Sequence, residues 1–125
     1  SQFIRKGIAK ENIVLKSKGT QYYSYTYVAN AVAGLLTCML EGKNGEAYNI
    51  ADIPWDIQLK DSAGIIARLS GTKVVFELPD EKERAGYSTA TKSSLDGSKI
   101  NKLGWFMHYN IEHGIKRTLE MLRKA

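Results

Sequence analysis

The sequence predicts one domain of the α/β class, spanning residues 1–125, in which about five helices are combined with short strands. Segments whose apolar residues recur every three or four positions, as in helices, alternate with short runs rich in β-branched and aromatic residues, as in strands. The chain has 43% hydrophobic and 25% charged residues, ordinary values for a globular domain. It contains no internal repeat or low-complexity stretch that would indicate a second domain.

The first quarter of the chain predicts a helix followed by two strands. Residues 3–10 place apolar side chains around a basic pair and predict the end of a helix. Residues 12–15 are mostly β-branched and predict a short strand. A turn at 17–20 leads into residues 22–28, whose aromatic and β-branched side chains predict a second strand.

The clearest helix prediction covers residues 28–40, where apolar side chains fall on one side of a 3.6-residue period. Gly42 stands just past the last turn, where a terminating glycine is favoured. We expect this helix to pack on residues 59–69 or 47–51, and its buried residues to be Leu35, Leu36 and Leu40.

The rest of the chain predicts three further helices and two strands. The strands predicted are few and short, so we expect some to pair with strands outside this chain or with a second copy, which makes a homo-oligomer one expected outcome. The predicted strands lie at 47–51 and 73–77, and a loop is predicted at 80–91. The predicted helices are one at 59–69 that is ended by Gly71, a short one that is capped by Asp96 or Ser98 and ends at Leu103, and one at 111–124 that is capped by Asn110. The last helix is expected to bury Ile111, Ile115, Leu119 and Leu122.

Composition limits the classes of function. The net charge of +5, from 18 Lys+Arg and 13 Asp+Glu, favours a phosphate-bearing ligand or nucleic acid, but the basic residues are scattered. The single cysteine, Cys38, excludes an internal disulfide. No apolar run approaches the roughly 20 residues that span a bilayer, and no signal peptide is recognisable, so we expect a cytoplasmic protein without membrane contact.

Several kinds of site are not predicted. The glycines form no G-x-G-x-x-G turn, which a dinucleotide pyrophosphate needs for close backbone approach, and no Tyr-x-x-x-Lys pair occurs. His108 and His113 are five positions apart and do not share one helical face. No serine lies in a G-x-S-x-G turn. We therefore assign no catalytic, cofactor-binding or metal-binding residue.

Two segments resemble the C-terminal, substrate-binding region of the extended short-chain dehydrogenases/reductases, the NAD-dependent epimerases and dehydratases of nucleotide sugars. After a G-x-Q turn that family usually reads Arg-Ser-Phe-Thr-Tyr-Val-Asp-Asp, and residues 23–30 here read YSYTYVAN. Near their C-terminal ends the sequences of that family have Ser-Lys, then Leu-Gly-Trp, then a helix with Gly and Arg-Thr. This chain is similar there, with Ser98-Lys99, Leu103-Gly104-Trp105, Gly114-Ile115 and Arg117-Thr118.

The resemblance implies a substrate-binding role for five residues. Arg84 matches an arginine that holds the substrate diphosphate in that family, and Tyr87 replaces an acidic residue close to it in sequence. Tyr23 replaces a second family arginine, and because a tyrosine carries no charge, one bidentate phosphate contact is lost. Ser24 and Tyr25 would be secondary donors. The resemblance further implies NAD or NADP and a nucleotide-diphosphate sugar as ligands of the complete protein. By this resemblance the chain is the C-terminal portion of an extended Rossmann-type epimerase, without the N-terminal cofactor domain. It would therefore be catalytically inactive alone.

Alternatives remain open at this point. Tyrosines at strand spacing also serve cross-strand packing. The basic charge and tyrosines together would suit a small nucleic-acid-binding module that stacks bases and contacts phosphates. Unpaired strand edges would suit an oligomerisation module without enzymatic activity.

Overall fold

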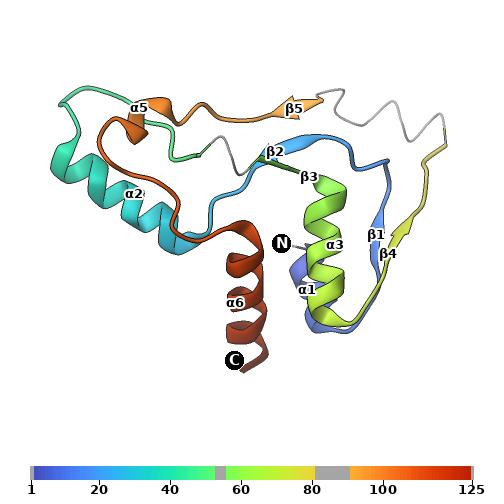
Figure 1. Ribbon diagram of the computed structural model, residues 1–125. Coiled ribbons are helices and arrows are strands. Elements are labelled where there is room, and N and C mark those ends of the chain that lie inside the picture. Colours follow the sequence, from blue (N-terminus) through green and yellow to red (C-terminus); the bar gives the residue numbers. More distant parts are fainter. Residues whose placement is uncertain (1, 53–55, 81–90, 125) are drawn as a thin grey trace.

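The computed structural model describes residues 2–52, 56–80 and 91–124, and within these ranges it confirms the α/β class (Figure 1). The described part contains five helices and five strands of two or three residues each. The helices are α1 (Gln2–Ile8), α2 (Val28–Glu41), α3 (Leu59–Ser70), α5 (Ser98–Asn101) and α6 (Ile111–Lys124), and the strands are β1 (Ile13–Leu15), β2 (Tyr22–Ser24), β3 (Asp56–Gln58), β4 (Val74–Phe76) and β5 (Lys92–Ser93).

The strands form two small sheets. In the first sheet β1 pairs in parallel with β4, with Ile13 opposite Val74. In the second sheet β2 is central, antiparallel to β3 and parallel to β5, with Tyr23 opposite both Ile57 and Ser93. Figure 1 shows the three-stranded sheet running above the helices α1, α3 and α6.

The main core lies where α3 packs on β1 between α1 and α6. Ile13 and Leu15 are two residues apart and therefore point to the same face of β1, and both are buried. Ala63, Ile66 and Ala67 of α3 cover them. An ion pair of 2.8 Å between Arg68 and Glu112 links α3 to α6 at the surface. Half-buried residues that pack against this core are Phe3, Ile4, Leu59, Val74 and Ile115.

A second cluster, the Trp105 cluster, holds α2 to the segment around α5. We define it as Ala51, Ile100 and Trp105, all buried, together with Asn30 and Gly34 of α2. A Cβ atom at Gly34 would lie 2.6 Å from Ile50 Cγ2 and 3.3 Å from the Trp105 ring. The helix can therefore approach this closely only because the side chain at position 34 is absent.

The predicted burial of α2 is wrong. Leu35, Leu36 and Leu40, expected in the core, are 61%, 50% and 72% exposed. Of the two expected packing partners, the segment 47–51 is confirmed, since Gly34 lies against Ile50, whereas α2 does not pack on α3. The periodicity correctly identifies the apolar side of the helix. Periodicity does not report whether anything covers that side, and here the opposite side, with its small residues, is the one that is buried.

The strand predictions need three corrections. Residues 47–51 form no strand: no described strand pairs with them, and the Ile50 carbonyl accepts the Thr26 hydroxyl. β2 ends at Ser24 rather than at residue 28, since the chain turns there to enter α2. β3 and β5 were not predicted, because their residue types have low strand preference and their pairing with β2 is non-local.

The ends of α2, α3 and α6 lie within one residue of their predicted positions, but α5 ends at Asn101 rather than Leu103, and its N-cap is Gly97 rather than Asp96 or Ser98. Gly71 adopts the left-handed conformation (φ 68°) after α3, and Asn110 Oδ1 accepts the His113 amide at 2.8 Å as an N-cap of α6. Asp96 Oδ1 accepts the Ser98 amide at 2.8 Å at the start of α5. Gly42 follows α2 as expected but is extended, and a Cβ there would lie 2.2 Å from the Cys38 carbonyl oxygen.

Two further sequence predictions can be compared with the structure. On α6, Leu119 is buried and Ile111 and Ile115 are half-buried, but Leu122, which was also expected to face inward, is 49% exposed. The predicted loop at 80–91 lies outside the described residues except at its two ends. Among the helices that are described, none is both long enough and apolar enough to cross a membrane.

Candidate functional site

The site predicted from the sequence begins at β2, which carries Tyr23 and Ser24 and leads directly to Tyr25. The rings of Tyr23 and Tyr25 are 6.1 Å apart between centroids and tilted by 55°, so the two side chains contact each other. Tyr25 is 39% exposed, whereas Tyr23 is half-buried. The structure thus brings these two tyrosines together at the junction of β2 and α2.

Tyr25 also forms part of the wall of an apolar pocket of about 620 Å³. The pocket lies between α1, α3 and α6 and is closed on one side by the link from β2 to α2. Its polar groups are few, as expected of a site that holds a ligand by shape and by a few oriented donors. The residues lining it are Gln2, Phe3, Ile4, Tyr25, Thr26, Tyr27, Val28, Ser62, Ile66, Tyr109, Ile111, Gly114, Ile115 and Thr118.

The Tyr25 hydroxyl stays protonated over the physiological range. Burial raises the pKa of this phenol above its usual 10.0, a hydrogen bond with Ser62 opposes the rise, and the neighbouring Tyr23 adds to it. Ser62 in turn donates to the Leu59 carbonyl at 2.9 Å, within the first turn of α3. Tyr25 can therefore offer a ligand a neutral hydroxyl and a ring edge, but no charge.

Ser24 is held by two protein partners. Its hydroxyl donates to Asp56 Oδ1 at 2.6 Å and accepts the Leu95 amide at 2.9 Å. One side chain thereby connects β2, β3 and the segment after β5. The single O–H of Ser24 is used on Asp56, so any contact with a ligand would have to use the remaining lone pair.

An aromatic row continues from the pocket along α6. Tyr27 meets Tyr109 edge to face at 5.9 Å between centroids, and Tyr109 stacks on His113 at 5.0 Å. A Cβ at Gly114 would lie 3.0 Å from three atoms of Tyr27, so the glycine lets α6 come close to the ring. Sequence reasoning had listed Gly114 as part of the family ending but had not connected it with Tyr27.

Asn30 is the residue that sequence reasoning missed. It is 1% exposed, although it lies in an apolar helix. Its Nδ2 donates to the Tyr109 carbonyl at 2.8 Å, its Oδ1 accepts the amides of His108 and Tyr109, and its backbone carbonyl accepts Trp105 Nε1 at 3.2 Å. One amide side chain therefore fixes the segment that brings Tyr109 to the pocket. A polar residue among apolar ones in a predicted helix was the signal available in the sequence.

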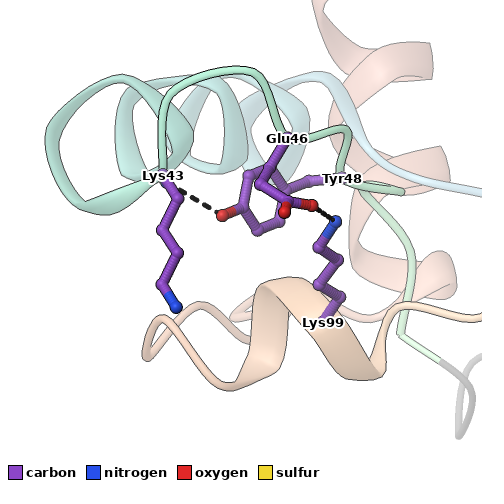
Figure 2. A network of polar contacts seen from close by, with 4 residues as sticks. All are labelled: Lys43, Glu46, Tyr48 and Lys99. Atoms are coloured by element: carbon purple, nitrogen blue, oxygen red, sulfur yellow. Dashed lines mark hydrogen bonds and ion pairs between the residues drawn. The ribbon is translucent and has the colours of Figure 1, made fainter.

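Lys99, from the Ser-Lys pair of the family-like ending, contacts the turn after α2 (Figure 2). Lys99 pairs with the carboxylate of Glu46, and its Nζ lies 4.8 Å from the centroid of the Tyr48 ring. The Tyr48 hydroxyl accepts the backbone amide of Lys43 at 2.9 Å. The hydrogen bond and the charge of Lys99 lower the pKa of Glu46 below its usual 4.5. These contacts fasten the turn after α2 to α5 and leave Lys99 already paired.

The described residues do not fit a dinucleotide cofactor. A pyrophosphate site needs a glycine turn between a strand and the start of a helix. The described strand-to-helix junctions are residues 25–27, Gln58–Leu59 and residues 94–97. Only the last contains a glycine, Gly97, and this single glycine precedes a helix of four residues and forms no glycine-rich turn. In the same ranges, 2–52, 56–80 and 91–124, no group of three or more His, Cys, Asp and Glu side chains could hold a metal ion. His108 and His113 are both exposed.

Two predicted site residues, Arg84 and Tyr87, lie outside the described residues. The five predicted substrate-binding residues are thus divided: Tyr23, Ser24 and Tyr25 are consecutive, and of these only Tyr25 lines the pocket, whereas Arg84 and Tyr87 are not described. A substrate-binding role stays a prediction for all five.

Comparison of the sequence with curated proteins finds enzymes of nucleotide-sugar metabolism. The chain is 29% identical over 128 residues to a UDP-N-acetyl-alpha-D-glucosaminuronate decarboxylase of Bacillus cytotoxicus, covering 98% of this chain and 39% of the relative. It is 26% identical over 125 residues to the dTDP-D-glucose 4,6-dehydratase of Mus musculus, covering 88% of this chain and 32% of the relative. The chain therefore spans well under half the length of these curated relatives. No protein-family model matches it.

Solved structures agree with this result. A UDP-glucose 4-epimerase from Thermotoga maritima, solved with UDP-glucose, matches 98% of this chain and 38% of its own, with a TM-score of 0.80 and 25% identity. A dTDP-glucose 4,6-dehydratase from Bacillus anthracis, solved with NAD, has a TM-score of 0.79 at 16% identity, covering 99% of this chain and 38% of its own, which supports the fold alone. The resemblance seen in the sequence is thereby confirmed over the whole chain. The names of these proteins give no support to the alternative of a nucleic-acid-binding module.

Proposed function

We propose, because this chain matches the C-terminal region of NAD-dependent epimerases and dehydratases, that it is the nucleotide-sugar-binding part of such an enzyme. The complete enzyme would use NAD or NADP bound elsewhere in its chain to act on a nucleotide-diphosphate sugar. That cofactor would supply the oxidation and reduction of the sugar. The chain described by this sequence would hold the nucleotide and diphosphate and form one wall of the site, without turnover of its own.

The observation that carries the proposal is the match to the Thermotoga maritima epimerase, which extends over 98% of this chain and was obtained with UDP-glucose present. Agreement in fold over nearly every residue argues that the substrate-side architecture is retained. The pocket beside Tyr25 and the tyrosine pair on β2 are features of this chain that would suit the apolar faces and hydroxyl groups of a nucleotide sugar.

Each proposed contact has a separate chemical task. Arg84 would be the main charged partner of the diphosphate, because Tyr23 occupies the position of the second arginine of the family. Tyr25 would offer its neutral hydroxyl and ring edge, and Tyr87 a further hydroxyl. Ser24 would act mainly by positioning β2 through Asp56, since its only hydrogen is donated there.

An NMR titration of the chain with UDP-glucose and with dTDP-glucose tests the proposal. We expect amide shifts at residues 23–27 and in the segment around Arg84, at millimolar ligand because only one wall of the site is present. Arg84→Ala should weaken binding about tenfold or more, the loss of one charge-assisted hydrogen bond. Arg117→Ala removes the same charge from α6 and is the matched control. Equal weakening by the two substitutions, or shifts spread over the whole surface, would contradict the proposal.

A further inference from the structure

The turn that follows α2 carries an asparagine directly before a glycine. Residues 43–46 form a four-residue turn, closed by the Glu46 amide on the Lys43 carbonyl at 3.2 Å, with Asn44 and Gly45 at its centre. Gly45 has a φ of 78°, as the third residue of a type II turn requires. All four residues are exposed, so water reaches both the Asn44 side chain and the Gly45 backbone.

The Asn44 side chain and the Gly45 backbone amide are free to react with each other. In the part of the chain that the structure describes, neither of these two groups makes a hydrogen bond. A Cβ built on Gly45 would have nothing within 4 Å, so no other part of the described chain is packed against the turn there. Because Gly45 has no Cβ, its backbone nitrogen is open to the side-chain carbonyl carbon of Asn44.

The other five asparagines of the chain are protected in two ways. Each has its side-chain amide in a hydrogen bond with a backbone amide or a backbone carbonyl. Each is also followed by a residue with a side chain, which crowds the approach to the next backbone nitrogen. These five are Asn12, Asn30, Asn49, Asn101 and Asn110. Asn44 differs from all of them in both respects.

A second pair with the same local chemistry, Asp96-Gly97, is protected by the fold. Asp96 Oδ1 accepts the Ser98 amide at 2.8 Å, and this bond keeps the pKa of Asp96 below its usual 3.8, so the side chain stays an unreactive carboxylate. Gly97 is buried, and a Cβ there would overlap the Ala51 carbonyl oxygen. The backbone at position 97 therefore has no room to rotate, whereas the turn at positions 44 and 45 has.

We propose that Asn44-Gly45 is a site of spontaneous modification, at which Asn44 is converted into aspartate and isoaspartate in the folded chain. The Gly45 nitrogen forms a bond to the side-chain carbonyl carbon of Asn44, and a five-membered succinimide ring closes. The side-chain nitrogen leaves as ammonia, which takes up the proton that Gly45 has lost. Water then opens the ring at either carbonyl, so that one opening gives aspartate and the other gives isoaspartate. Nothing is oxidised or reduced, and the formal net charge of +5 falls by one.

The modification acts on the contacts that fasten this turn (Figure 2). Before the turn, the Lys43 amide donates to the Tyr48 hydroxyl at 2.9 Å. After it, Glu46 pairs with Lys99 of α5. In isoaspartate the main chain runs through the side-chain carbon, which adds one atom between these two anchors. The hydrogen bond of 3.2 Å that closes the turn cannot keep its geometry, so the turn is held less firmly to α5.

Incubation of the folded chain at mildly alkaline pH, followed by peptide mapping with mass spectrometry, tests the proposal. Conversion of an amide into an acid changes the mass, fragment spectra assign the change to one residue, and a carboxyl methyltransferase specific for isoaspartate labels that product. We expect both products at Asn44, with one ammonia released per converted chain. The other asparagines should react at least about tenfold more slowly, the factor that one hydrogen bond sets. Asn44→Gln should stop the reaction, because its longer side chain would have to close a less favourable six-membered ring.

Asp96→Asn is the matched control, because it places an identical Asn-Gly pair where the glycine is buried. In the folded chain this pair should react at least about tenfold more slowly than Asn44. In urea, where both segments are unfolded, the two pairs should react at similar rates. Equal rates in the folded chain would overturn the proposal. An Asn44 that stays intact in the folded chain but reacts in urea would also overturn it.

The effect on the turn is measured on the separated products. The isoaspartate form should melt about 1–5 °C below the unmodified chain, as expected from the loss of one turn hydrogen bond. Asn44→Asp carries the same charge without the additional main-chain atom and should melt within about 1 °C of the unmodified chain. Equal melting temperatures for the isoaspartate form and Asn44→Asp would contradict the effect inferred for the turn.

Discussion

Replacing Asn30 by alanine should destabilise the chain more than any change of similar size at the surface. The substitution removes the 2.8 Å donor to the Tyr109 carbonyl and the acceptor shared by the amides of His108 and Tyr109 at 3.2 and 3.3 Å. A buried polar group left without a partner costs about 1–3 kcal/mol. The two long bonds are weak and Tyr109 is itself partly exposed, so water can replace some of the loss. We expect about 2–4 kcal/mol in total, a fall in Tm of roughly 6–16 °C.

Thermal and urea unfolding followed by circular dichroism measure this loss. Asn49→Ala is the matched control, because its amide also donates to a backbone carbonyl, that of Asp96 at 3.0 Å, but at an exposed position. The control should lose about 0.5 kcal/mol. Asn30→Asp keeps the acceptor but buries a carboxylate with one oxygen against the Tyr109 carbonyl, so it should lose at least as much stability as Asn30→Ala. Equal losses for Asn30→Ala and Asn49→Ala would refute the role assigned to Asn30.

Four further outcomes are expected. Ile66→Ala opens a cavity in the main core and should cost about 2–5 kcal/mol in urea unfolding, whereas Leu36→Ala should cost under about 1 kcal/mol in the isolated chain; the reverse order would show that the faces are misassigned. The lowered pKa of Glu46 contributes stability above its usual 4.5 that is lost as the pH falls through the lower folded value, so Glu46→Gln should flatten that part of the pH profile. Because the pKa of Tyr25 is raised in the folded state, the free energy of unfolding should fall as the pH rises above 10.0, and Tyr25→Phe should reduce that fall. An equal fall in the two proteins would show that the Tyr25 hydroxyl is exposed to solvent in the folded chain. In the part of the chain that the structure describes, the outer edges of the β1–β4 sheet have no partner strand. Self-association through them would be seen by sedimentation and should be abolished by Val75→Lys; a strict monomer would show that these edges are protected.

Local signals in the sequence predicted the helices well. The apolar periods at 28–40, 59–69 and 111–124 correspond to α2, α3 and α6 within one or two residues. Their ends follow from side chains and glycines close in sequence, such as Asn110 capping His113. Information of this kind is contained in four or five consecutive residues, which is why it can be read without the fold.

Long-range features could not be read in the same way. β3 and β5 exist because distant segments lie beside β2, and nothing in Asp56-Ile57-Gln58 or Lys92-Ser93 alone indicates a strand. The open side of α2 is equally non-local, since the apolar pattern of a helix is the same whether its cover is present or absent. Ser24 resembled a ligand donor in the sequence, and only the structure shows its hydroxyl on Asp56, 32 positions away.

The most direct test of the central claim is a pair of calorimetric titrations of the same sample of this chain, one with UDP-glucose and one with NAD. The chain is proposed to carry the nucleotide-sugar side of the enzyme and lacks the glycine turn that a dinucleotide needs, both in the sequence and at the described strand-to-helix junctions. We predict a weak, saturable heat with UDP-glucose that is reduced by Arg84→Ala, and a flat trace with NAD. A micromolar isotherm with NAD, together with a flat trace for UDP-glucose, would contradict the account.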